Sequence, residues 1–233
     1  MNTSELLGLL ARTLAGLDPD ATVAARMCRA CTTILGAQGG SLTLATLAGE
    51  PVAVTSTDAV AARVEGIQEV LGEGPGRQAF EHDTIVSAPL GLGDDDPFPV
   101  FSQLAGEAAG DGRWFGIPMH VGGQPVGVLG LVVGPGRVLA RDVEDAQFLA
   151  DAIGTAVLGE IDQVGWSARA RVDQATGMVS AQLRLQPHDA LAVLRAHAFG
   201  RGSALEDVAE DVVARRLSFA DETGPVETRR TED

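Results

Sequence analysis

The pattern of apolar residues changes once along the chain, near Arg141, and this change limits the possible folds more than any other feature. Before Arg141, alternating or continuous apolar runs predict several strands. After it, apolar residues recur at steps of three and four and strand signals disappear. That spacing is typical of one face of a helix. The sequence therefore predicts an α+β first part and an all-helical second part.

The sequence of the first part predicts a sheet flanked by helices. The strongest strand signal is the continuous apolar run 126–133, which is typical of a central strand covered on both faces. Turn signals at Gly-Gly and Gly-Pro pairs separate the elements. The expected helices lie within 4–35, with a break at Asp18-Pro19-Asp20, and at 59–71, 77–81 and 100–109, and the expected strands lie at 41–47, 52–56, 84–87, 114–120 and 125–133.

The second part begins with a long apolar seam. We expect one helix over 141–183 that connects the two parts. A seam of this length suggests a parallel coiled coil between two copies of the chain, and therefore a homodimer. The seam residues are Val143, Ala146, Ala150, Ile153, Val157, Ile161, Val164 and Ala168.

Two shorter helices follow, at 188–199 and 204–217, around a Gly200-Arg201-Gly202 turn. Ser203 with Glu206 three residues later has the form of a capping box. The expected domains are a sensor at 1–158, the connecting helix at 141–183 that overlaps both, and a three-helix output domain at 165–217. We expect the polar tail 218–233 to be disordered.

Charge is distributed unevenly. The formal net charge is -15, of which residues 1–164 carry -13, residues 165–217 carry +1 and the tail carries -3. All 17 basic residues are arginine. A near-neutral second part is compatible with nucleic-acid binding but does not by itself argue for it, because such domains usually present a basic face.

The sequence holds little that favours an enzyme, a cofactor, a metal or a membrane. No run reaches the roughly 20 apolar residues that span a bilayer, and two closely spaced cysteines form no disulfide framework, which favours a cytoplasmic protein. The four histidines have no metal-ligand spacing. Cys28 and Cys31 lie in an apolar helix stripe, where free cysteines pack as small hydrophobes. We expect the glycines of 72–76 to form a turn between helices, since the segment lacks the features of a phosphate loop.

Three stretches of the first part carry a family resemblance. They are GEGPGRQAF at 72–80, WFGIPM at 114–119 and PVGVLGL at 125–131. Together they resemble a GAF domain of the actinobacterial regulator type, over about residues 3–158. The resemblance implies an antiparallel sheet flanked by helices with a small-molecule pocket, whose ligand the residues leave open.

The second part resembles another family. VDQATGM at 172–178, DALAVLR at 189–195 and LEDVA at 205–209 follow one another at the spacing of an ANTAR domain. The resemblance implies a three-helix, RNA-binding module of transcription antiterminators that works as a dimer and holds hairpin loops of nascent transcripts. By the same resemblance the RNA-binding residues are Arg171, Ala175, Thr176, Gly177, Arg184, Arg195, Arg201 and Ser203.

Some positions depart from the ANTAR pattern. The family usually has lysine at Thr176, and asparagine followed by basic residues at 202–204. The leading hypothesis is a non-enzymatic, signal-responsive antitermination regulator. One alternative is a dimerising sensor whose degenerate output domain binds a protein. Another is a GAF-type methionine sulfoxide reductase that uses Cys28 and Cys31, which their placement on one apolar helix disfavours.

Overall fold

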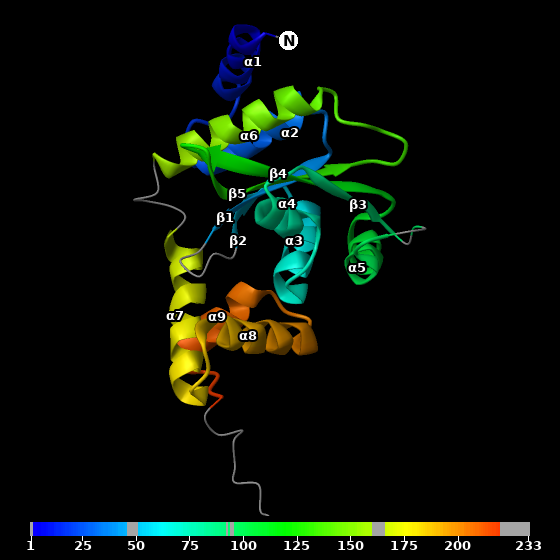
Figure 1. Cartoon of the computed structure of the whole chain (residues 1–233). Coiled ribbons are helices and arrows are strands. Elements are labelled where there is room, and N and C mark those ends of the chain that lie inside the picture. Colours follow the sequence, from blue (N-terminus) through cyan, green and yellow to red (C-terminus); the bar gives the residue numbers. More distant parts are fainter. Residues whose placement is uncertain (1, 46–50, 92, 94–95, 160–165, 220–233) are drawn as a thin grey trace, which may run out of the picture.

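A computed structural model describes residues 2–45, 51–91, 93, 96–159 and 166–219, with side chains from residue 170 onward in the last range. The expected break in architecture is present. Residues 2–159, the first domain, hold a sheet and six helices, and residues 166–219, the second domain, hold three helices (Figure 1).

The sheet has five antiparallel strands in the order β2-β1-β5-β4-β3. The hairpin between β4 and β5 turns through Gly122 and Gly123, which both adopt the positive φ angles that glycine tolerates best. The strands are β1 (Gly39–Ala45), β2 (Pro51–Ser56), β3 (Val86–Leu90), β4 (Gly112–Val121) and β5 (Gln124–Val133). The central position predicted for the apolar run 126–133 is confirmed.

Helices cover both faces of this sheet. On one face lie α2 (Val23–Ile34) and α6 (Val143–Leu158), with α1 (Thr3–Ala15) packed on α2 (Figure 1). On the other lie α3 (Ala59–Leu71), α4 (Pro75–His82) and α5 (Pro99–Ala109). The alternation of side chains along the strands sends Ile117, Leu129 and Leu131 toward α2 and α6, and Trp114 and Val132 toward α3 and α5.

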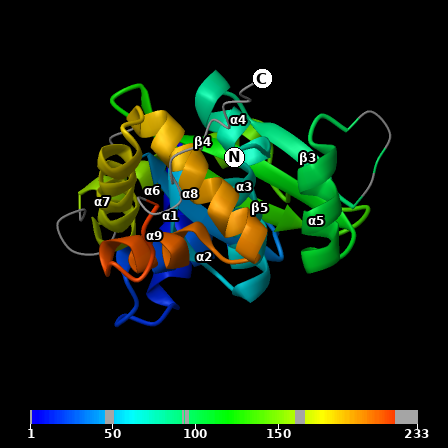
Figure 2. The same cartoon turned by 90° about the horizontal axis from the view of Figure 1, so that it is seen from below.

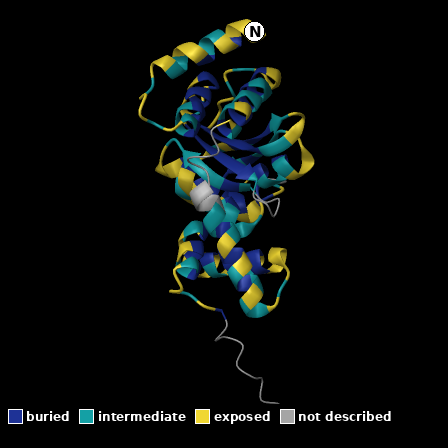
Figure 3. Cartoon of the chain, turned by 90° about the vertical axis from the view of Figure 1, so that its left-hand side faces the viewer, coloured by how far each residue is buried: buried dark blue, intermediate teal, exposed yellow. Residues whose placement is uncertain are grey.

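The second domain is a three-helix bundle made of α7 (Trp166–Leu183), α8 (Pro187–Arg201) and α9 (Leu205–Val213). Small and β-branched residues let the helices approach closely, and the buried faces form a continuous interior (Figure 3). Its buried core consists of Val172, Ala175, Val179, Ala190, Leu191, Leu194, Ala198, Leu205, Val208, Ala209, Val212 and Phe219, together with Val52 from β2 of the first domain.

The predicted connecting helix is two helices in the structure. Helix α6 ends at Leu158, with Gly159 as its C-cap, and α7 begins at Trp166, while residues 160–165 lie outside the described residues. The apolar seam is also used differently from the expectation. Its members Ala146, Ala150, Ile153 and Val157 are buried against the sheet and α2. Helical periodicity reveals an apolar face but not what covers it, so the coiled-coil interpretation of this stretch is corrected to a domain core.

Two further expectations near the C-terminal end also change. Ser203 does not cap α9, because the N-cap is Ala204 and the Glu206 carboxylate lies toward Arg171 instead. The tail does not begin at 218, because Phe219 is 4% exposed and belongs to the bundle core. Its backbone N–H donates to Gln182 Oε1 at 3.0 Å, and its ring meets His197 edge-on at 5.3 Å.

Candidate nucleic-acid interface

Arg195, one of the predicted RNA-binding residues, contacts the first domain. It lies on α8, and its Nε donates to the backbone oxygen of Glu69, at the C-terminal end of α3, at 2.9 Å. Its stem and guanidinium lie beside Gly72, the C-cap of α3. The side chain thus leaves its own domain and contacts the first domain.

Arg171, Arg201 and Arg216 of the second domain face carboxylates. Arg171 lies 3.7 Å from Glu206 and 3.8 Å from Glu210. Arg201 and Arg216 share Asp211, at 3.4 Å and 2.8 Å. These two hydrogen bonds, led by the one from Arg216, lower the pKa of Asp211, which therefore stays ionised. The sequence contained a signal for this arrangement, since acids at 206, 207, 210 and 211 lie on one short helix among the arginines.

The small residues predicted to approach RNA fall into two groups. Ala175 and Thr176 are buried in the bundle, and the Thr176 hydroxyl donates to the backbone oxygen of Val172 at 2.7 Å. They therefore support the helix rather than present atoms to a ligand. Gly177 is exposed, and a Cβ built there would meet no atom within 4 Å. This open position on α7 lets another backbone come close.

Arg184 and Ser203 complete the predicted set at two helix ends. Arg184 is exposed just after α7 with a φ of 54°, and it forms no ion pair with another described residue. Ser203 lies in the turn between α8 and α9, where its Oγ is buried without a hydrogen-bond partner among the described residues. The structure does not bring these two together with Arg195 by any direct contact that it describes.

Sequence reasoning missed the junction between the domains. Strand β2 packs against α7, and α3 packs against α8, which crosses in front of it when seen from below (Figure 2). Val52 is only 5% exposed because the second domain covers it, and Val70 packs on the same core. A valine in an edge strand gives no signal that its partner is another domain.

Glu69 is the ionisable group at this junction. Its carboxylate accepts a hydrogen bond from the Ala53 N–H of β2. Although parts of the residue reach the surface, its carboxyl faces the junction. Loss of hydration, reinforced by Glu206 and opposed by Arg195, raises its pKa to about 7. Glu69 therefore couples β2, α3 and the second domain electrostatically.

Comparison with family models assigns both domains. Residues 20–157 match the GAF domain model. The chain belongs to the GAF domain family. Residues 166–213 match the ANTAR domain model, so the second domain is an ANTAR domain. The resemblances seen in the sequence are thus confirmed, and GAF and ANTAR domains are sensory and regulatory rather than catalytic.

Three solved structures are similar to parts of this chain. The second GAF domain of DevS from Mycobacterium smegmatis is 25% identical, with a TM-score of 0.41, over 63% of this chain and 97% of that one. A domain of a two-component sensor histidine kinase protein from Sinorhizobium meliloti 1021 is 16% identical, with a TM-score of 0.44, over 66% and 98%. An RNA-binding light-oxygen-voltage receptor is 17% identical, with a TM-score of 0.23, over 79% and 49%. A comparison with curated proteins found no match.

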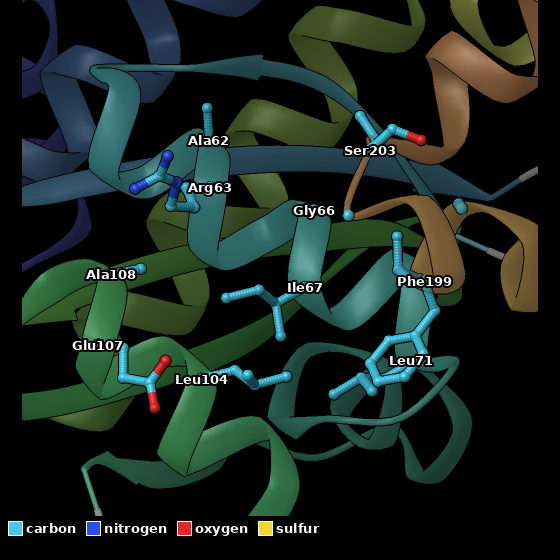
Figure 4. A pocket seen from close by; sticks show the side chains of 14 residues that line it. Ala62, Arg63, Gly66, Ile67, Leu71, Leu104, Glu107, Ala108, Phe199 and Ser203 are labelled. Carbon is cyan, nitrogen blue, oxygen red and sulfur yellow. The ribbon is translucent and has the colours of Figure 1, made fainter.

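The GAF domain has a filled interior between the sheet and α3. Trp114, Phe101 and Val64 pack there without exposure. A hollow of about 750 Å³ lies instead where α3 and α5 meet the α8–α9 turn of the ANTAR domain. Figure 4 shows Ile67, Leu71 and Phe199 gathered along it. The apolar lining and the position between two domains distinguish it from a pocket inside the sensor.

The remaining reactive groups of the GAF domain are structural. Burial raises the pKa of Cys28 to about 12 and raises that of Cys31 as well, so neither thiol forms the reactive thiolate. His120 holds Asp83 and Asp151 through its two ring nitrogens, at 2.5 and 2.7 Å, which ties α6 to the end of α4. Within the described residues, no group of three or more His, Cys, Asp or Glu side chains is arranged to hold a metal ion.

Among the residues that the structure describes, no helix is both long enough and apolar enough to cross a membrane.

Proposed function

We propose that this chain is a signal-responsive antitermination regulator that binds RNA hairpin loops through its ANTAR domain. The observation that carries the proposal is a complete ANTAR bundle attached to a GAF sensor, with Arg184 and Gly177 exposed and Arg195 on its surface. Sequence-specific RNA binding uses unpaired loop bases, and arginine contacts both phosphates and base edges. Nascent transcripts place this activity in the cytoplasm.

The proposed active species is a homodimer that holds two hairpins. The support is the pairing of recognition modules that the ANTAR family implies. The buried seam residues of α6, namely Ala146, Ala150, Ile153 and Val157, do not supply the contact surface between the two copies, because the core of the GAF domain already covers them. A selection from a genomic RNA library should therefore recover short hairpins in pairs.

The direct test is the Arg195→Ala variant of the full chain. We expect it to bind selected hairpins roughly tenfold more weakly than wild type at low salt, because an arginine contact to nucleic acid contributes on the order of 1–3 kcal/mol. Arg12→Ala on α1, far from the ANTAR domain, is the matched control. Recovery of no RNA above background at low salt, both by the wild-type chain and by a folded variant opened at the junction between the domains, would contradict the proposal.

A second candidate function is protein binding by the ANTAR domain. The observation that favours it is the pairing of Arg171, Arg201 and Arg216 with carboxylates of α9. Paired arginines have less charge to offer to phosphates. A stoichiometric protein partner that survives nuclease treatment, together with absent RNA binding, would establish this function instead.

A further inference from the structure

We propose that the surface of the ANTAR domain around Arg195 has two mutually exclusive partners, the C-terminal end of α3 in the GAF domain and RNA. The structure then represents the closed form, in which RNA is excluded. This inference rests on the proposed function, since it describes how the same RNA site is regulated.

The first step is the contact between Arg195 and α3. The last carbonyl groups of a helix have no partner within the helix, and they carry the negative end of its dipole. The Glu69 carbonyl is one of these groups because α3 ends at Leu71. Arg195 Nε reaches it at 2.9 Å. The arginine therefore caps a helix of the other domain, a role that an isolated ANTAR bundle does not need.

Gly72 lies where this contact is made. It is the C-cap of α3, with a φ of +68° that glycine tolerates best. A Cβ at this position would lie 3.4 Å from both Cδ and Nη1 of Arg195, which is van der Waals contact. The Arg195 side chain therefore packs against the backbone at the end of α3.

Apolar contacts hold the two surfaces together around this arginine. Val52 of β2 and Val70 of α3 pack on the ANTAR core. Burial of apolar surface stabilises the closed form, so these two valines act together with the hydrogen bond from Arg195. Opening must expose both valines.

The two partners exclude each other for steric and electrostatic reasons. A guanidinium that lies between Gly72 and the Glu69 carbonyl cannot also face a phosphate. RNA brought to this surface would in addition approach residues 1–164, which carry a formal charge of -13. A signal that opens the junction would release Arg195. The apparent affinity for RNA then scales with the fraction of open molecules.

The test is the Val70→Glu variant of the full chain, which places a charge in the apolar junction without altering the ANTAR domain. The matched control is Val60→Glu, which lies on the same helix but is 42% exposed and outside the junction. Circular dichroism verifies that both variants are folded. Binding is measured by filter retention of a labelled pool of tandem RNA hairpins with randomised loops.

We expect Val70→Glu to bind roughly five to ten times more tightly than wild type, because opening no longer opposes RNA binding. Val60→Glu should match wild type, and adding Arg195→Ala to Val70→Glu should remove the gain. Equal RNA binding by wild type and a folded Val70→Glu would overturn the closed-form inference while leaving the proposed function intact. Binding by neither variant nor wild type would overturn both. If Val70→Glu does not fold, Val52→Asp replaces it with the same expectations.

Discussion

At the residue scale, Glu65 and Glu69 lie one turn apart on α3, and the pKa of each carboxyl group is raised to about 7. Glu65 is 6% exposed and accepts a hydrogen bond from the Ser41 hydroxyl at 2.7 Å and from Gln68 Nε2 at 3.4 Å. Burial raises its pKa to about 7, despite the stabilising bond from Ser41. A raised carboxyl pKa means that the folded chain binds a proton more tightly than the unfolded chain does.

This charge state predicts a pH dependence of stability. The proton on Glu65 stabilises the fold fully below its ordinary pKa of 4.5, and that stabilisation is lost as pH rises toward about 7. Raising pH from 5.5 to 7.5 should therefore cost up to about 2 kcal/mol through this group. Urea unfolding of Glu65→Gln should show a smaller pH dependence than wild type. Glu73→Gln, at an exposed position, should retain the full dependence, and an equal slope in both variants would contradict the prediction.

At the scale of elements, the bundle depends on a residue beyond its last helix. Phe219 lies six residues after α9 ends, and it closes the space between α7 and α8 through Gln182 and His197. Short bundles have small cores, so one aromatic residue is a large share of the apolar volume. The three helices alone therefore do not complete the ANTAR domain.

This closure predicts the effect of Phe219→Ala. Removing a buried aromatic ring leaves a cavity and should lower the free energy of unfolding of the ANTAR domain by about 3 kcal/mol. Phe199→Ala is the control, because Phe199 is 56% exposed and should cost less than about 1 kcal/mol. Denaturant unfolding followed by circular dichroism measures both. Equal losses would show that Phe219 does not belong to the folding unit.

At the scale of the whole molecule, an acidic sensor is joined to an ANTAR domain in which Arg171, Arg201 and Arg216 form ion pairs with carboxylates of α9. Among the described residues of this domain, Arg184 and Arg215 form no ion pair, and Arg195 becomes available on opening. Under the proposed function, a chain with few cations for phosphates must gain most of its RNA affinity from contacts to loop bases. This differs from a strongly basic binding face, in which released counterions dominate the affinity.

The charge distribution predicts a shallow salt dependence of RNA binding. With about three phosphate contacts, the logarithm of the binding constant should fall with the logarithm of salt concentration at a slope of roughly -2. Arg184→Ala should reduce the magnitude of this slope by about 0.7, while Arg12→Ala should leave it unchanged. Titrations over several salt concentrations measure these slopes. A slope steeper than about -4 would show that paired arginines such as Arg171 also reach RNA.

The sequence by itself determined the two domains, their order and most of their elements. Local periodicity is sufficient to predict these elements, because the repeats of helices and strands depend on residues close together in the chain. The run 126–133 and the residues of α8 are examples. It also determined that Cys28 and Cys31 are core residues. The family patterns at 72–80 and 172–178 carried the assignment to GAF and ANTAR domains.

Only the tertiary structure decided what each apolar or charged face meets. The stripe of α6 faces its own sheet, Arg195 caps a helix of the other domain, and Phe219 folds back into the bundle. These contacts join residues far apart in the chain, such as Arg195 and Glu69, so no local pattern encodes them. Helical periodicity predicts that an apolar face is buried, but only the tertiary packing determines which surface covers that face.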